Sequence, residues 1–323
     1  TKQLASAMLD FEEFRDLPHA VTLLGMSGVG KTVLATSLRR SMNWFHYSAD
    51  YRIGTTYLAE HILDNIKFKI MRMGDRFVAD LLRSDSIYIN HNISVDNLAP
   101  VSTFLGMYGD AGSGGLDKKT FLERQKLYWQ AEIGSMKDVG RFISKSWQIY
   151  RCKDFINDAS GSLCEICDPK DPDDPIMTSL AADTLILYLR AGDAYAENLI
   201  KRAQSDPKPL FYNLEFIGPY LQDNPDSGAG IDPPAFARPL FPELVKFRKP
   251  RYDAIAENFG FTIDADDLFD RGYGEKAAPA SDRFLTKLFN TVVRQAKQSQ
   301  ATADKLARYV DSCHKRRHER IGV

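Results

Sequence analysis

A glycine-rich stretch near the start of the chain, AVTLLGMSGVGKT at residues 20–32, constrains the fold more than any other feature. Val21 to Leu24 is a short apolar run that predicts a buried strand. The next eight residues match the pattern G-x-x-x-x-G-K-[ST] without a gap. After them Leu34 and Leu38 stand four apart, as on one face of a helix. The sequence therefore predicts a strand, a glycine loop and a helix in immediate succession.

A glycine loop between a strand and a helix is a phosphate cradle, because successive backbone N–H groups point inward and the positive end of the helix dipole lies beside them. Lys31 would bridge the β- and γ-phosphates of ATP, and the Thr32 hydroxyl would hold Mg²⁺. A turn that binds nothing is the alternative, and the complete spacing disfavours it. The residues expected to bind ATP are Gly25, Ser27, Gly28, Val29, Gly30, Lys31 and Thr32.

The composition is that of an ordinary globular protein, and it narrows the possible partners. With 323 residues the chain can bury a large core, as one elaborated domain or as two. A net charge of −1 gives no global field that would recruit nucleic acid or an anionic membrane. No apolar run approaches the length that spans a bilayer. The first residues show no basic stretch followed by an apolar core, so we expect no signal peptide and a cytoplasmic protein.

The four cysteines, Cys152, Cys164, Cys167 and Cys313, are too few for a disulfide scaffold in a chain of this size, which favours a reducing compartment. Cys164 and Cys167 form a lone C-x-x-C. A zinc site would need a second pair of ligands at a usual spacing, and the sequence has no such pair. We interpret the two as buried thiols, with a metal or redox role as the alternative.

The remainder of the chain alternates between strand-like and helical stretches, which predicts a parallel sheet of about five strands with helices on both faces. Helical spacing predicts a first helix over 3–16, with Leu4, Met8, Phe11 and Phe14 on one side, and a long final helix over 281–320. Residues 222–242 are rich in proline and glycine and predict a loop. Further strands are expected at 43–48, 152–158, 184–189 and 261–263.

Residues 55–150 interrupt this alternation with a long run of helical spacing. We therefore divide the chain into three parts. Residues 1–54 form the first part of the α/β core. Residues 55–150 form a helical insertion that serves as the acceptor or lid region, and 151–323 complete the core with a lid and the C-terminal helix.

Asp50 and Asp158 each follow a predicted strand, at the edge of a parallel sheet where active sites lie. Here the chain resembles the P-loop small-molecule kinases, such as shikimate kinase and adenylylsulfate kinase. The resemblance implies that Asp50 orients or deprotonates the acceptor hydroxyl and that Arg52 binds an anionic acceptor. We also expect the strand before Asp50 to run beside the strand at 21–24. A helix cap at Asp50, with Arg52 paired to it on the surface, is the alternative.

Three further patches fit the same resemblance. Asp158 resembles a Walker B carboxylate, which would hold Mg²⁺ through water, although it could instead start a turn into Ser160 and Gly161. Lys201 and Arg202 stand where these kinases carry a basic lid, which implies that Arg202 stabilises the transferring phosphoryl group; a solvated helix face is the alternative. The stretch RKPRYDAIA at 248–256 resembles the R-x-P-x-Y…A pattern before the last strand.

The resemblance as a whole implies a kinase that uses ATP and Mg²⁺ to phosphorylate a hydroxyl of a small, anionic metabolite or nucleotide. A GTPase is disfavoured because the base-reading motif N-K-x-D does not occur. A regulatory ATPase usually carries a glutamate after the Walker B aspartate, and Ala159 stands there. A nucleotide-dependent binding or signalling module, with the helical insertion as its partner surface, is the third reading.

Overall fold

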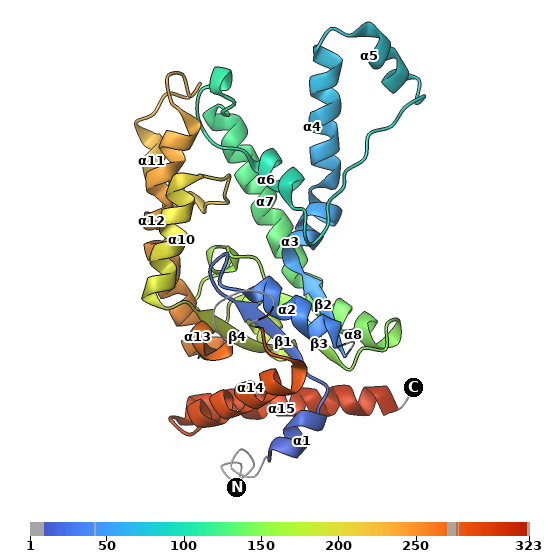
Figure 1. Cartoon of the computed structure of the whole chain (residues 1–323), viewed down its shortest axis with the longest axis vertical. Helices are drawn as coiled ribbons and strands as arrows, with labels where there is room; N and C mark the ends of the chain where they lie inside the picture. The colour runs from blue at the N-terminus through green and yellow to red at the C-terminus, as the bar shows by residue number, and fades with distance from the viewer. Residues whose placement is uncertain (1–9, 42, 270–275, 277, 322–323) are drawn as a thin grey trace. The chain divides into compact units, whose positions relative to one another are not determined.

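The computed structural model of the chain describes residues 10–41, 43–269, 276 and 278–321 (Figure 1). It divides into two compact units. The core unit comprises Thr1–Ala49, Met136–Ser205 and Leu240–Val323, and the helical unit comprises Asp50–Ser135 and Asp206–Pro239. The three-part division predicted from the sequence, with its acceptor region over 55–150, stays a prediction.

The core unit is built on one sheet of five parallel strands in the order β2-β3-β1-β4-β5, which confirms the predicted α/β fold. The expectation that β2 runs beside β1 is wrong, because β3 pairs with both and lies between them. Ser48 of β2 and Leu23 of β1 both stand opposite Asp158 of β3. The strands are β1 Ala20–Leu24, β2 Trp44–Ser48, β3 Asp154–Asp158, β4 Leu185–Arg190 and β5 Gly260–Asp264.

Helices cover both faces of this sheet, because the alternating side chains of each buried strand must be shielded on both sides. On one face Val21 and Leu23 join a core cluster with residues of α1, α2, α14 and α15. On the other face α8 and α9 pack on the strands, and Tyr188 of β4 stacks on Tyr252 of α12. The helices are α1 Phe11–Asp16, α2 Lys31–Arg40, α8 Val139–Gln148, α9 Pro175–Asp183, α10 Asp193–Ser205, α12 Pro233–Phe259, α13 Ala265–Leu268, α14 Ser281–Ala296 and α15 Gln300–Ile321.

Two predicted stretches differ in the structure. The loop expected over 222–242 ends early, because α12 begins at Pro233. Proline is tolerated at the first helical position, and the Asp232 carboxylate accepts the Ala235 N–H to cap the helix. The helix expected over 281–320 is two helices, α14 and α15, separated at 297–299.

The helix predicted over 3–16 is described only from Phe11, where α1 begins with Asp10 as its N-cap. Phe14 is fully buried, as the predicted apolar face requires. Leu4 and Met8 lie outside the described residues. None of the described helices has the length and apolar character that a membrane crossing requires.

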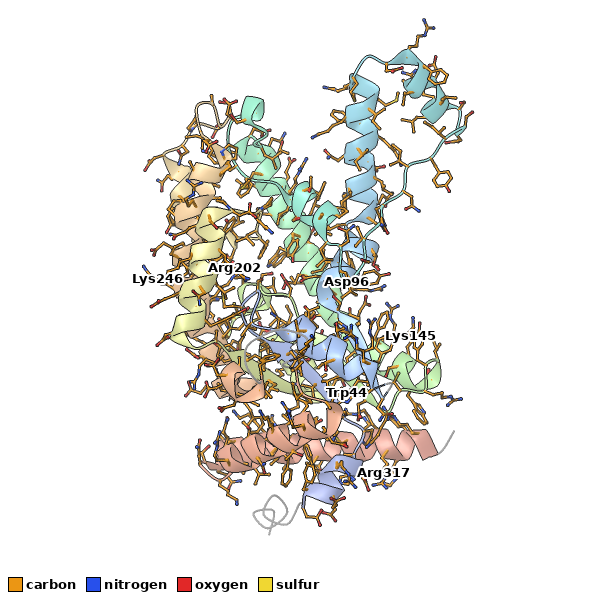
Figure 2. The ribbon with its side chains drawn as sticks, in the orientation of Figure 1. Trp44, Asp96, Lys145, Arg202, Lys246 and Arg317 are labelled. Atoms are coloured by element: carbon orange, nitrogen blue, oxygen red, sulfur yellow. The ribbon has the colours of Figure 1, made fainter. Side chains whose placement is uncertain are left out.

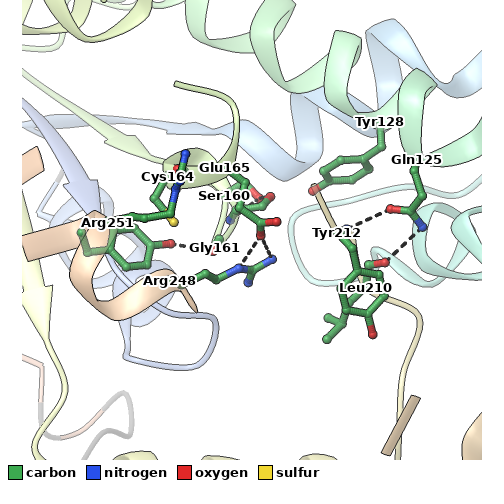
Figure 3. Close-up of polar contacts among 12 residues, drawn as sticks. Gln125, Tyr128, Ser160, Gly161, Cys164, Glu165, Leu210, Tyr212, Arg248 and Arg251 are labelled. Atoms are coloured by element: carbon green, nitrogen blue, oxygen red, sulfur yellow. Dashed lines mark hydrogen bonds and ion pairs between the residues drawn. The ribbon is translucent and has the colours of Figure 1, made fainter. Parts of the chain in front are cut away.

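The helical unit joins two separate segments of the chain through backbone contacts. The Asp110 N–H donates to the Ile231 carbonyl at 2.8 Å, and the Lys118 N–H donates to the Asp226 carbonyl at 2.8 Å. The buried Gln125 amide accepts the Tyr212 N–H at 2.9 Å (Figure 3). Residues 206–239 therefore fold with the helical extension. Its elements are α3 Ala49–Arg52, η2 Ile53–Tyr57, α4 Ala59–Arg72, α5 Arg76–Arg83, α6 Ala99–Leu105, η3 Ala111–Ser113, α7 Lys118–Lys137 and α11 Leu214–Gln222, with the start of α12.

Two ionisable side chains are buried where β1 and β3 begin. The Nε2–H of His19 donates to the Phe14 carbonyl at 2.9 Å, so Nδ1 accepts from the Tyr309 hydroxyl at 2.8 Å. Burial lowers the pKa of His19 to about 3. The Asp154 carboxylate accepts the backbone N–H of His19 at 2.8 Å, and burial raises the pKa of Asp154 to about 7. A negative charge at this position therefore opposes folding.

Asp154→Asn is expected to stabilise the protein increasingly as pH rises. The folded-state pKa lies above the ordinary value of 3.8, so the contribution of this carboxyl to stability is fully present below pH 4 and is lost as pH rises through 7. Asparagine keeps the acceptor oxygen for His19 and carries no charge. The gain in unfolding free energy over wild type should grow by about 2 kcal/mol between pH 5 and pH 8 in urea titrations. The exposed Asp311→Asn serves as control, and a pH-independent gain for Asp154→Asn would contradict this account.

Candidate nucleotide site

The glycine loop connects the end of β1 to the start of α2, as its motif predicts. Gly28 and Gly30 adopt φ angles of 88° and 97°, in the left-handed region that favours glycine. Gly30 is the N-cap of α2, and a Cβ added there would lie 2.6 Å from Cζ of Phe269. The backbone therefore requires glycine here for two independent reasons. The N-terminal N–H groups of α2 begin directly after it, which is the arrangement that binds phosphate.

Lys31 is the first residue of α2, and its side chain is buried against the loop. Its ammonium donates to the carbonyl of Gly25 at 2.7 Å and to that of Met26 at 3.2 Å. A buried ammonium must be surrounded by oxygen acceptors, and phosphate oxygens are stronger acceptors than carbonyls because they are charged. The glycine conformations, the start of α2 and this ammonium together fit a nucleoside polyphosphate. ATP binding by these residues stays a prediction.

Side chains of α10 lie over the apex of the loop. The Tyr195 hydroxyl donates to the Gly28 carbonyl. A Cβ added at Gly28 would lie 2.9 Å from Cδ2 of Leu199 and 3.6 Å from Nη2 of Arg202. Figure 2 shows Arg202 on α10. Both basic residues that the sequence singles out are exposed, and Arg202 lies beside the loop.

Asp158 is the last residue of β3 and is buried. Its Oδ2 lies 3.3 Å from Nε2 of His46, whose side chain is only 1% exposed. Thr32 lies in the first turn of α2 and is exposed. A carboxylate and a hydroxyl are oxygen ligands that suit Mg²⁺, which keeps several waters and takes phosphate oxygens as further ligands. In the described part of the chain no three His, Cys, Asp or Glu side chains form a metal cage.

Sequence reasoning missed His46. It stands two residues before Ser48 at the end of β2, and strand alternation places both on one face. Trp44 on this face belongs to the apolar core, so a histidine two residues later is a polar side chain next to that core. This polar residue at a core-facing position is the sequence feature that could have pointed to His46. Its meaning depends on β3 being the neighbour of β2, which the sequence does not reveal.

Asp50 and Arg52 belong to the helical unit and lie in α3, directly after β2. The Tyr128 hydroxyl donates to Oδ1 of Asp50 at 3.3 Å, which orients this carboxylate. The Arg52 guanidinium lies 5.8 Å from the centroid of the Tyr57 ring. The π-helical turn η2 follows at once, and such turns occur frequently at functional sites. The roles of Asp50 and Arg52 toward an acceptor stay predictions.

The segment after β3 is held by buried polar contacts with α12. Arg248 and Glu165 form an ion pair, with Nε donating to Oε1 at 2.5 Å, and both side chains are buried (Figure 3). Arg251 donates to the carbonyls of Cys164 and Cys167 at 2.8 Å and 3.1 Å. Both cysteines are buried free thiols, and burial raises the pKa of Cys164 to about 12, which disfavours a reactive thiolate.

No protein-family model matches the chain, and neither does any curated protein. Among solved structures it is similar to shikimate kinase from Bacteroides thetaiotaomicron, with a TM-score of 0.36 and 16% identity over 84% of this chain and 98% of that one. It is also similar to shikimate kinase from Acinetobacter baumannii in complex with shikimate, with a TM-score of 0.37 and 14% identity over 90% of this chain and 100% of that one.

Lys31→Ala is expected to cause a large loss of MgATP affinity or turnover, because it removes the charge that would meet the β- and γ-phosphates. The fold should persist, since the Met26 carbonyl also accepts the Val29 N–H at 3.2 Å and the Tyr252 hydroxyl lies 3.3 Å from the Gly25 carbonyl. Isothermal titration calorimetry with MgATP and a melting curve of the variant test both parts. Lys246→Ala, an exposed lysine on α12, is the matched control. Equal ATP affinity in Lys31→Ala and wild type would show that this loop is not the nucleotide site.

Proposed function

We propose that this protein is an ATP- and Mg²⁺-dependent phosphotransferase that moves the γ-phosphate of ATP to a hydroxyl of a small, anionic metabolite or nucleotide. The observation that carries the proposal is the glycine loop at the carboxyl end of β1, with the Lys31 ammonium held inside it. Phosphoryl transfer needs positioning and charge neutralisation more than covalent chemistry. A loop, a lysine, an arginine and two metal ligands suffice for that.

Each element of the core unit has a role in this proposal. The backbone N–H groups of the loop and Lys31 bind the phosphates. Thr32 and Asp158 hold the metal ion, which supplies charge neutralisation at the phosphates. Arg202, beside Gly28, stabilises negative charge on the transferring group. His46 fixes the orientation of the Asp158 carboxylate.

Transfer to an acceptor is favoured over simple ATP hydrolysis by the chemistry of the segment after β3. An ATPase needs a carboxylate there to activate water. Ala159 follows Asp158, and Glu165 is the only acidic residue between 159 and 167. Glu165 is buried and paired with Arg248, so it serves a structural ion pair. In the helical unit, the proposal assigns Asp50 to the acceptor hydroxyl and Arg52 to an anionic group of the acceptor.

The experiment that tests the proposal is ADP release from MgATP with and without a panel of hydroxyl-bearing metabolites and nucleotides. A kinase releases ADP slowly alone and faster with its acceptor, and mass spectrometry then finds the acceptor heavier by one phosphoryl group. Rapid ADP release without any acceptor would replace the kinase with an ATPase. Binding of MgATP with no turnover under any condition would support a nucleotide-dependent binding module.

Asp50→Asn is expected to lower acceptor-dependent turnover by about two to four orders of magnitude, because asparagine is a poor base and carries no charge. MgATP affinity should stay near wild type. The Tyr128 hydroxyl can still donate to the asparagine side-chain oxygen, so local structure is kept. Full acceptor-dependent turnover in Asp50→Asn would reduce Asp50 to a helix-terminal residue.

Arg52→Ala tests the other half of the acceptor assignment. It should raise the acceptor KM and leave kcat closer to wild type, because a uniform binding contact is lost. The effect should be larger for anionic acceptors than for neutral analogues of the same shape. An unchanged KM for an anionic acceptor would remove Arg52 from the site.

A further inference from the structure

Tyr252 of α12 connects two loops at the carboxyl edge of the sheet. Its side chain is fully buried, and its ring stacks on Tyr188 with centroids 5.3 Å apart. Its hydroxyl donates to the Gly161 carbonyl at 2.5 Å and lies 3.3 Å from the Gly25 carbonyl. A hydroxyl has one proton. The shorter contact shows that this proton is directed mainly to Gly161.

The Gly25 carbonyl is also the acceptor for Lys31. The Lys31 ammonium donates to it at 2.7 Å, which makes it a charge-assisted bond. Under the proposed function, on which this inference rests, Lys31 leaves that carbonyl to meet bound phosphates. A buried carbonyl that loses its donor carries a desolvation cost unless another donor replaces it. The Tyr252 hydroxyl is a donor already within reach of Gly25.

We propose that Tyr252 is a positioning residue of the nucleotide site, whose hydroxyl bridges the Gly161 and Gly25 carbonyls and shares more of its proton with Gly25 as Lys31 moves to bound phosphates. Tyr252 thus keeps the first residue of the glycine loop in place. This role gives a function to the tyrosine of the RKPRYDAIA stretch, which the sequence singles out and the proposed reaction does not use.

Contacts of neighbouring residues on α12 hold Tyr252 in position beside the two carbonyls. The neighbouring Arg248 and Arg251 anchor the same turn of α12 to the segment after β3. That segment lies directly against the glycine loop, because a Cβ added at Gly161 would lie 2.3 Å from Oγ of Ser27 and 2.9 Å from its backbone nitrogen. The Tyr252 hydroxyl therefore contacts the glycine loop directly at the Gly25 carbonyl and indirectly through Gly161, which lies against Ser27.

The test is Tyr252→Phe, which removes the hydroxyl and keeps the stacked ring, with Tyr188→Phe as the matched control in the same stacked pair. We expect the Kd for MgADP, measured by calorimetry, to rise about tenfold in Tyr252→Phe and to stay at the wild-type value in Tyr188→Phe. Melting curves verify that both variants are folded. A wild-type Kd in folded Tyr252→Phe would overturn the proposal.

A double-mutant cycle separates this role from general loosening of the fold. In Lys31→Met no ammonium leaves Gly25, so adding Tyr252→Phe should not change the MgADP Kd further. A tenfold loss in both backgrounds would show a purely structural tyrosine and overturn the proposal. If wild type itself does not bind MgADP or MgATP, the proposed function fails; if wild type binds and Tyr252→Phe binds equally, only this inference fails.

Discussion

The buried ammonium of Lys31 is the interaction on which the candidate site depends. A charge removed from water needs acceptors close to it, and here the loop's own carbonyls supply them. The chain must therefore bend back on itself within six residues, which requires glycine at positions of positive φ. The same bend ends at Gly30, the N-cap of α2, so the first N–H groups of the helix follow it directly. The shape of the glycine loop, the position where α2 begins and the burial of the Lys31 ammonium therefore depend on one another.

Local features of this constraint can be predicted from the sequence, because they involve residues near one another in the chain. The strand, glycine loop and helix follow from apolar runs and from the G-x-x-x-x-G-K-[ST] spacing, and the alternation of strands with helices predicts the parallel sheet. All five strands lie where the apolar runs predict them, to within two residues at the start and one at the end.

Features that depend on which strands are neighbours are not visible in the sequence. The pairing of β3 with both β1 and β2 brings His46 to Asp158, and no pattern in either strand specifies it. The Glu165–Arg248 ion pair joins residues 83 positions apart. Residues 233–242 look like a loop because of their prolines, yet a proline at the first helical position and the Asp232 cap start α12 there.

The side chains next to the glycine loop and the Glu165–Arg248 ion pair bear on whether ATP would be used for transfer or for hydrolysis. Leu199 lies against Gly28 and Phe269 lies against Gly30, and both side chains are buried. The apolar side chain at Gly30 lowers the dielectric near the buried Lys31 ammonium, which strengthens its interaction with a phosphate bound there, whereas Ser27, Gly28 and Arg202 are exposed to water. Glu165 is buried and paired with Arg248, so the segment from 159 to 167 has no other carboxylate that could activate water.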